Sequence, residues 1–183
     1  MEQKLNPIHL ACGDDDMRPN MLLIEVKNNI AIATNGHLLV KIDLTETSML
    51  SPADLTTLNG KYIHKEIWKE IHKCDTLEIF DEQIDCFKNG VKKTFYYSEP
   101  NGEFFNINSI VREIADAGEE EKRIIGFNAK FITILQKIFQ SDTLIFSFSK
   151  GNKGTLVFPN DQTGMFAVLM PLTTEGINRY YFL

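Results

Sequence analysis

The chain has 183 residues, of which 43% are hydrophobic and 24% are charged, a globular composition that argues against intrinsic disorder. Acidic residues (25) outnumber Lys and Arg (19), so the formal net charge is −6, and such a chain repels polyanions unless its basic side chains gather on one surface. Apolar runs such as 166–172 are far shorter than the roughly 20 residues that cross a bilayer. The N-terminal MEQKLNPIHL has no apolar signal core. We therefore expect a cytoplasmic protein without membrane contact.

Apolar and β-branched runs fill the first part of the chain. Residues 21–26 and 30–33 flank the turn residues Lys27-Asn28-Asn29, which predicts two strands joined by a tight turn. Residues 37–44 follow as a third predicted strand. Residues 45–60 are rich in Ser, Thr and Pro and lack strand periodicity, so we expect a connecting segment there.

The periodicity changes between residues 61 and 74. Ile63, Ile67 and Ile71 recur every fourth residue, with Trp68 beside them, which predicts an amphipathic helix. Strands are then predicted at 76–80, 84–87 and 93–98, followed by a short extended segment at 104–111. The acidic run 116–121 is either a linker or a solvated turn.

A second helical pattern covers residues 127–140, and strands are predicted at 143–149, 154–158 and 165–170. The helix from Lys61 followed by Asp75-Thr76-Leu77 matches the helix from Asn128 followed by Asp142-Thr143-Leu144, at an offset of 67 residues. The match indicates a repeated unit of one helix and antiparallel strands; the alternative is a chance likeness of two amphipathic helices. We expect an α+β fold.

Lysines recur along the polar sides of both predicted helices. Those of the first helix are spaced i, i+4 and therefore stack along one side. Either this stripe faces an anion such as a phosphate backbone, or Glu66 and Glu70 neutralise it as ordinary solvated surface. The candidate DNA-binding residues are Lys61, Lys65, Lys69, Lys73, Lys130 and Lys137.

No residue pattern is typical of a catalytic or metal site. His64 and His72 are too far apart for the i, i+4 metal-binding pair, and Asp14-Asp15-Asp16 lacks the spacing of an EF-hand. An odd number of cysteines without CxxC spacing predicts ordinary thiols: Cys12, Cys74 and Cys86. We expect no catalytic activity, no cofactor and no metal.

Three segments carry motifs of a known family. RPNMLLIEV (18–26) leading to ATNGHLL (33–39) is similar to that family's RPVLNGVLLE and ATDGHRLA. GEFFN (102–106) is similar to GEFPDY. The segments GFNAK (126–130) and VLMPL (168–172) are similar to its closing FNPKYL helix and VMPMR strand. In this order and spacing they resemble the bacterial β sliding clamp, the processivity subunit of the replicative DNA polymerase.

The resemblance implies a fold and two kinds of partner. The family's ring is built from helix-plus-strands units, with helices lining the hole and sheets outside. It implies sequence-independent binding of double-stranded DNA, and an apolar cleft for short peptides of replication proteins. The matching cleft positions are Thr34, Gly36, His37, Leu38, Leu39, Phe105, Ile110, Val168, Leu169, Met170, Pro171 and Leu172.

The chain departs from the family pattern in four motif residues and in length. Asn35 replaces Asp, Leu38 a basic residue, Phe105 a proline, and Thr173 an arginine. We expect about three units instead of the twelve in a full ring. These are a domain at 1–115, with a truncated first unit and a second unit at 60–111, and a half-domain at 122–183. One alternative is a clamp-like processivity factor, for which a homo-oligomer is one option. The other is a non-encircling adaptor that binds replication-protein peptides without DNA.

Overall fold

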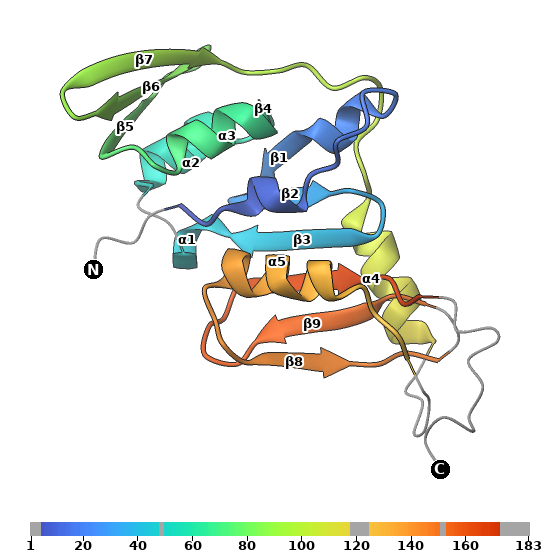
Figure 1. Ribbon diagram of the computed structural model, residues 1–183. Helices are drawn as coiled ribbons and strands as arrows, with labels where there is room; N and C mark the ends of the chain where they lie inside the picture. The colour runs from blue at the N-terminus through green and yellow to red at the C-terminus, as the bar shows by residue number, and fades with distance from the viewer. Residues whose placement is uncertain (1–4, 48–49, 118–124, 151–152, 173–183) are drawn as a thin grey trace.

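The computed structural model describes residues 5–47, 50–117, 125–150 and 153–172. Its strands form two antiparallel sheets (Figure 1), one of seven strands in the order β4-β1-β2-β3-β10-β9-β8 and one of three in the order β5-β6-β7. The strands are β1 (Leu23–Lys27), β2 (Ile30–Thr34), β3 (Leu38–Asp43), β4 (Lys61–His64), β5 (Thr76–Ile79), β6 (Gln83–Lys88), β7 (Val91–Tyr96), β8 (Leu144–Ser147), β9 (Thr155–Pro159) and β10 (Met165–Leu169).

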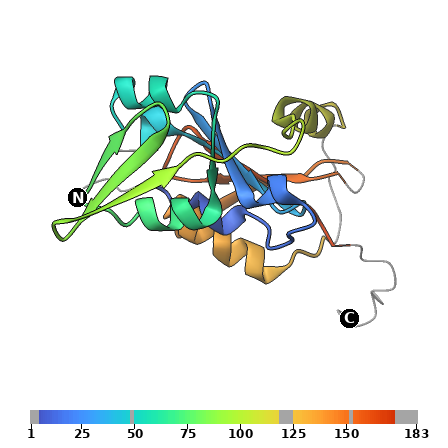
Figure 2. The same cartoon turned by 90° about the horizontal axis from the view of Figure 1, so that it is seen from above.

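Helices cover both faces of the seven-stranded sheet. Helices α3 (Lys65–Ile71) and α5 (Ala129–Phe139) lie on one side, and α4 (Ile107–Asp116) lies on the other (Figure 2). The short 3-10 helix η1 (Ile8–Ala11) packs against both α3 and α5. The remaining helices are η2 (Pro19–Leu22), α1 (Leu44–Thr47) and α2 (Pro52–Leu58). None of the helices among these described residues is long and apolar enough to cross a membrane.

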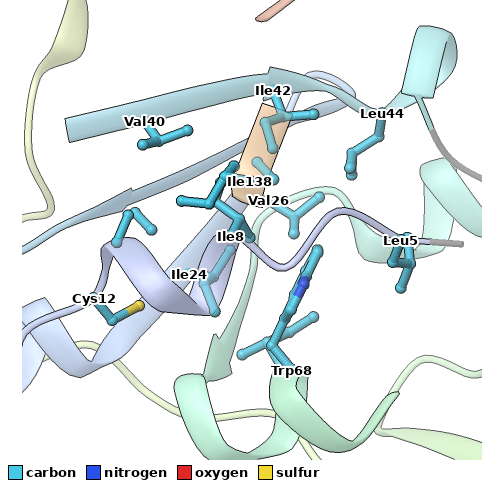
Figure 3. Packing of buried hydrophobic residues seen from close by; sticks show 14 of the residues in the cluster. Leu5, Ile8, Cys12, Ile24, Val26, Val40, Ile42, Leu44, Trp68 and Ile138 are labelled. Carbon is cyan, nitrogen blue, oxygen red and sulfur yellow. The ribbon is translucent and has the colours of Figure 1, made fainter. Parts of the chain in front are cut away.

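The main hydrophobic core lies between the seven-stranded sheet and helices α3 and α5. Alternate strand residues such as Val26, Val40 and Ile42 point into it, because successive side chains of a strand face opposite sides. Trp68 of α3 is fully buried among them (Figure 3). Its indole N–H donates to the backbone oxygen of Asn6 at 2.9 Å, which satisfies the one polar group that this large side chain buries.

A second, smaller core lies on the opposite face of the same sheet. Ile32, Leu39 and Val168 point to this side and are buried with Ile107 and Ile114 of α4. Both faces of the central strands are therefore covered. This explains why β2, β3 and β10 read as nearly continuous apolar runs.

The predicted repeat is present as a repeated order of elements. α3 is followed by β5, β6 and β7, and α5 is followed by β8, β9 and β10. β1, β2 and β3 form another set of three strands, which is preceded by η1 and η2 in place of a long helix. Because β10 pairs with β3, segments 1–115 and 122–183 share one sheet; their division into domains remains a prediction. Residues 118–121 of the acidic run lie outside the described residues.

The helix predicted from residue 61 was placed four residues too early. Residues Lys61–His64 form β4, which pairs with β1, and α3 begins at Lys65. His64 is the N-cap, since its Nδ1 accepts the backbone N–H of Glu66 at 3.3 Å. Pairing with β1 satisfies backbone groups at the edge of the sheet, and that tertiary gain overrides the local helical periodicity.

Two further segments differ from the sequence-based expectation, because helix-start signals were overlooked. Residues 45–60 contain α1 and α2, and α2 begins with a capping box in which Ser51 and Asp54 bond each other's backbone N–H. The segment at 104–111 was predicted to be extended, but its residues from Ile107 onward belong to α4. Asn106 caps this helix by accepting the Ser109 backbone N–H at 3.3 Å.

The prediction of three ordinary thiols was wrong for two cysteines. Cys74, just after α3, forms a disulfide with Cys86 of β6, and their Cα atoms are 5.9 Å apart. Cys12 is free and buried, and burial raises the pKa of its thiol to about 12. The pairing follows from the packing of the three-stranded sheet against the end of α3, which the spacing of the cysteines in the sequence does not reveal.

Candidate functional site

Five of the six predicted DNA-binding lysines lie on or beside α3 and α5. Lys65 and Lys69 are on α3, Lys73 follows it, and Lys130 and Lys137 are on α5. The sixth, Lys61, was assigned to the helix but lies on β4. Its Nζ donates to the backbone oxygen of Asp81 at 2.7 Å and lies 5.1 Å from the centre of the Tyr97 ring.

Lys65 of α3 bonds to the loop that contains Gly13 and Asp14. Its side chain is 16% exposed and is ion-paired with Asp14, and its Nζ also donates to the backbone oxygen of Gly13 at 2.8 Å. This contact, with its hydrogen bond, lowers the pKa of the Asp14 carboxyl. The Asp14 carboxylate therefore neutralises one member of the predicted lysine stripe.

The other lysines on this side are exposed. Lys69 Nζ lies 3.0 Å from Glu66 Oε2, one turn earlier on α3, an exposed pair that contributes little to stability. Lys73, Lys130 and Lys137 are exposed as well. The acidic residues of α3 thus neutralise part of its charge, whereas α5 carries no acidic residue between Ala129 and Phe139.

The pKa of His9 is lowered by burial and by nearby lysines of this side. It sits on η1 with its ring centroid 4.9 Å from that of His72. Its pKa is lowered to about 4, first by burial and then by His72, Lys73 and Lys69. His9 is therefore neutral at pH 7; Glu66 acts in the opposite direction to Lys69 and Lys73 but does not outweigh them and the burial.

The predicted peptide cleft begins at a tight turn between β2 and β3. Thr34 Oγ1 donates to the Leu38 backbone oxygen at 2.9 Å and accepts the Gly36 backbone N–H at 3.1 Å. Gly36 has a φ of +86°, a conformation that favours glycine. Asn35 Oδ1 accepts the backbone N–H groups of His37 and Leu38. An aspartate, which the family motif has at this position, also carries a side-chain oxygen that can accept these two backbone N–H groups.

β3 and β10 bring the next part of the set together. Leu39 pairs with Val168, and Leu38 pairs with Leu169. The two pairs point to opposite faces: Leu38 and Leu169 are buried in the main core, and Leu39 and Val168 lie with Ile110 in the second core under α4. Leu38 and Leu169 therefore hold the strands in place from the main core, and Leu39, Val168 and Ile110 pack together on the opposite face beside α4.

Two exposed apolar side chains follow where β10 ends. Met170 is 39% exposed and Leu172 is 53% exposed. The Met170 backbone N–H donates to the His37 backbone oxygen at 2.9 Å. His37 is exposed, and its ring stacks on Phe131 of α5 with centroids 6.2 Å apart. Leu172 pairs with Gly126 through an isolated bridge, which anchors the chain just after the half-buried Pro171.

Phe105 has different neighbours from the rest of the predicted cleft. Its ring contacts Phe104 edge-on, with centroids 5.0 Å apart, and it lines a groove over β1 and β2. The predicted site residues did not include Phe131, whose ring stacks on His37, or Ile114 of α4, which is buried with Leu39 and Val168. The spacing of Ile107, Ile110 and Ile114 was the available signal for α4, since it follows one face of a helix.

Two of the three consecutive aspartates lie beside basic side chains. Asp14 pairs with Lys65, and Asp15 accepts the Met17 backbone N–H and lies 3.8 Å from Arg18. No group of three or more His, Cys, Asp or Glu side chains suited to a metal ion occurs within the described parts of the chain.

Comparison with known proteins identifies the fold through structure alone. No family model and no curated protein matches the sequence. The Caulobacter crescentus β sliding clamp aligns with a TM-score of 0.63 and 16% identity over 92% of this chain and 64% of its own. The Bacillus subtilis DNA polymerase sliding clamp aligns with a TM-score of 0.62 and 12% identity over 94% and 60%.

The chain has the fold of bacterial sliding clamps. A third clamp, from Bartonella birtlesii and bound to griselimycin, aligns with a TM-score of 0.61 and 13% identity over 91% of this chain and 63% of its own. The protein thus spans 60–64% of the length of these clamp chains. The expected α+β fold of helix-plus-strands units is confirmed.

Proposed function

We propose that this protein is a sliding-clamp-like accessory of DNA replication, without catalytic activity, that binds duplex DNA independently of sequence and binds partner peptides in an apolar cleft. The observation that carries this proposal is the clamp fold with α3 and α5 on the same side of the sheet. Exposed lysines on that side supply charges for a phosphate backbone: Lys69, Lys73, Lys130 and Lys137.

Contacts of this kind depend on charge and not on base sequence. Lysine ammonium groups neutralise phosphates and release counterions, so affinity falls steeply with salt. The acidic remainder of the molecule opposes binding at long range, and screening weakens that opposition beyond about 10 Å at moderate ionic strength. The proposal therefore predicts weak binding by a single copy and a measurable salt slope.

The DNA half of the proposal is tested with two matched double variants. Lys73→Gln/Lys137→Gln removes two charges from the helical side, and Lys27→Gln/Lys41→Gln removes two from residues that line the groove on the opposite face. In fluorescence anisotropy with labelled duplex DNA over a salt series, the first variant should lose affinity. Its log–log salt slope should fall by about 2 if both lysines meet phosphates. Equal affinity of the two variants at low salt contradicts DNA binding by this side.

The peptide half rests on the exposed side chains of His37, Met170 and Leu172, which lie where β3 begins and β10 ends. Griselimycin, the ligand of the Bartonella birtlesii clamp, is a suitable probe. Met170→Ala should weaken griselimycin binding in isothermal calorimetry about tenfold or more, because it removes exposed apolar surface. Ile145→Ala, which truncates an exposed apolar side chain on β8, is the control. Undiminished binding to the Met170 variant contradicts this cleft.

A second candidate is an adaptor that binds replication-protein peptides without encircling DNA. The chain spans 60–64% of the compared clamps, and four copies of about three units are needed for twelve. Sedimentation equilibrium distinguishes the two. A tetramer supports an encircling clamp, whereas a strict monomer with intact griselimycin binding supports the adaptor.

A further inference from the structure

A separate groove lies on the face of the seven-stranded sheet that carries α4. It has a volume of about 620 Å³, within the range typical of ligand sites. Strands β1 to β4 contribute to it from the sheet, and the segment 102–108 forms another part of its lining. We call it the Glu25 groove; its central lining residues are Glu25, Ile30, Ile32, Tyr62, Phe104 and Phe105.

The strand register places the key side chains next to one another. Glu25 pairs with Ile32 of β2 on one side and with Tyr62 of β4 on the other. Directly paired residues project from the same face of a sheet. Since Ile32 belongs to the small core under α4, Glu25 and Tyr62 also face this side.

The Glu25 carboxylate is nearly buried. The residue is 7% exposed, and its Oε1 accepts the Tyr62 hydroxyl at 3.2 Å. Burial and the nearby Glu25 charge both raise the pKa of Tyr62, as expected for a phenol held against an anion. A buried carboxylate gains most from a cationic partner, because neutral hydrogen bonds replace only part of its lost hydration.

Aromatic rings accompany the carboxylate. Tyr62 and Phe104 have ring centroids 5.4 Å apart, and Phe104 and Phe105 have centroids 5.0 Å apart. Aromatic faces attract cations, and a guanidinium group also stacks on them. A carboxylate beside such rings is suited to an arginine side chain, which can use a bidentate hydrogen bond and ring stacking together.

The charged residues around the groove limit how many cations it accepts. Lys27, Lys41 and Glu103 also line it. Lys41 Nζ lies 5.3 Å from the centre of the Phe166 ring on β10, so this lysine already has an aromatic partner. Lys27 is exposed. These two lysines repel a partner segment that carries several basic residues, so the groove favours a partner with one cationic side chain near Glu25.

We propose that the Glu25 groove binds one arginine side chain of a partner polypeptide, with the guanidinium on the Glu25 carboxylate and against the neighbouring aromatic rings. This is a second interaction surface, and it does not depend on the DNA or peptide contacts proposed above. It shares Phe105 with the residues assigned to the peptide cleft, but its carboxylate and its strands β1 and β4 are its own.

NMR titration of the full chain with N-acetyl-arginine amide tests the proposal, and N-acetyl-citrulline amide is the neutral ligand of the same shape. Arginine should shift the amide signals of Glu25, Ile32 and Phe104 with a millimolar dissociation constant, and citrulline should bind at least tenfold more weakly. Glu25→Gln, which keeps an acceptor for Tyr62, should abolish the preference. Glu103→Gln should keep it.

Equal affinity for the two ligands, or an unchanged arginine preference in Glu25→Gln, overturns the assignment. Phe104→Leu provides a second readout: it should weaken arginine binding several-fold while Glu25 keeps the preference over citrulline. In a folded Glu25→Gln variant, binding of duplex DNA and griselimycin should be unchanged, so failure of this proposal and failure of the clamp-like function are separable.

Discussion

Substitution of Gly154 by alanine tests the packing of α4 against the sheet. A Cβ atom at this position would lie 2.4 Å from Val168 Cγ1, 3.1 Å from Ile114 Cδ1 and 3.5 Å from Met170 Sδ. The shortest of these distances is impossible without movement. Val168 is on β10, which is paired on both sides with β3 and β9, so relief must come from a side-chain change or from a shift of Ile114 and α4.

The expected cost combines two opposing effects. Overpacking a filled core costs about 1–3 kcal/mol. Replacing glycine also restricts the unfolded chain, which stabilises by about 0.4–1 kcal/mol where the backbone conformation suits alanine. Gly154 is not among the residues with positive φ, so that gain applies. We expect Gly154→Ala to lower the free energy of unfolding by about 1–2 kcal/mol.

Urea unfolding of a double-mutant cycle provides the assay. Val168→Ala removes the atom that lies nearest to the added methyl group, so Gly154→Ala should cost less than about 0.5 kcal/mol in that background. Val168→Ala alone destabilises, because it leaves a cavity. The reasoning is refuted if Gly154→Ala is neutral in the wild-type protein, or if its cost is the same in both backgrounds.

Three other features of the structure give measurable consequences. In the folded protein the pKa of His9 is lowered to about 4, so folding favours its neutral form. Its effect on the free energy of unfolding should be absent above about pH 6.5. Towards pH 4 the free energy of unfolding should fall by about 1–2 kcal/mol, a figure that allows for solvent screening. His9→Asn should flatten urea-unfolding data across that window, and His37→Asn should not. Reduction of Cys74–Cys86 should lower stability by about 2–3 kcal/mol, and the Cys74→Ser/Cys86→Ser protein should then match the reduced wild type; equal stability with and without reductant contradicts this. Cys12, with its pKa raised to about 12, should react with Ellman's reagent at pH 8 only after denaturation, and rapid reaction of the native protein would show that this thiol is accessible.

Local pattern was sufficient for most of the strands and for α5. The runs that became β1, β2 and β3 are apolar and β-branched with turn residues between them, and α5 has apolar residues at helical spacing on one side. The repeat was also visible, because buried positions of α3 and α5 keep the same spacing: Trp68 and Ile71 in one, Leu135 and Ile138 in the other. These features arise from contacts with one shared core.

Tertiary structure decided the features that depend on distant partners. Lys61 and Lys65 were equivalent members of a lysine stripe in sequence, but pairing of β4 with β1 and the contact of Lys65 with Asp14 gave them separate roles. Cys74 and Cys86 form a disulfide only because the three-stranded sheet packs against α3.

The candidate sites show the same division. The sequence by itself determined which motif residues stand near one another along the chain, such as Leu38 and Leu39, and strand periodicity places these two on opposite faces. Only the tertiary structure decided that α4 covers Leu39 and that Glu25 lies between Tyr62 and Ile32. The periodicity of apolar residues indicates which side chains are buried. The partner of each side chain across the sheet depends on strand register and on the packing of elements far away in the chain.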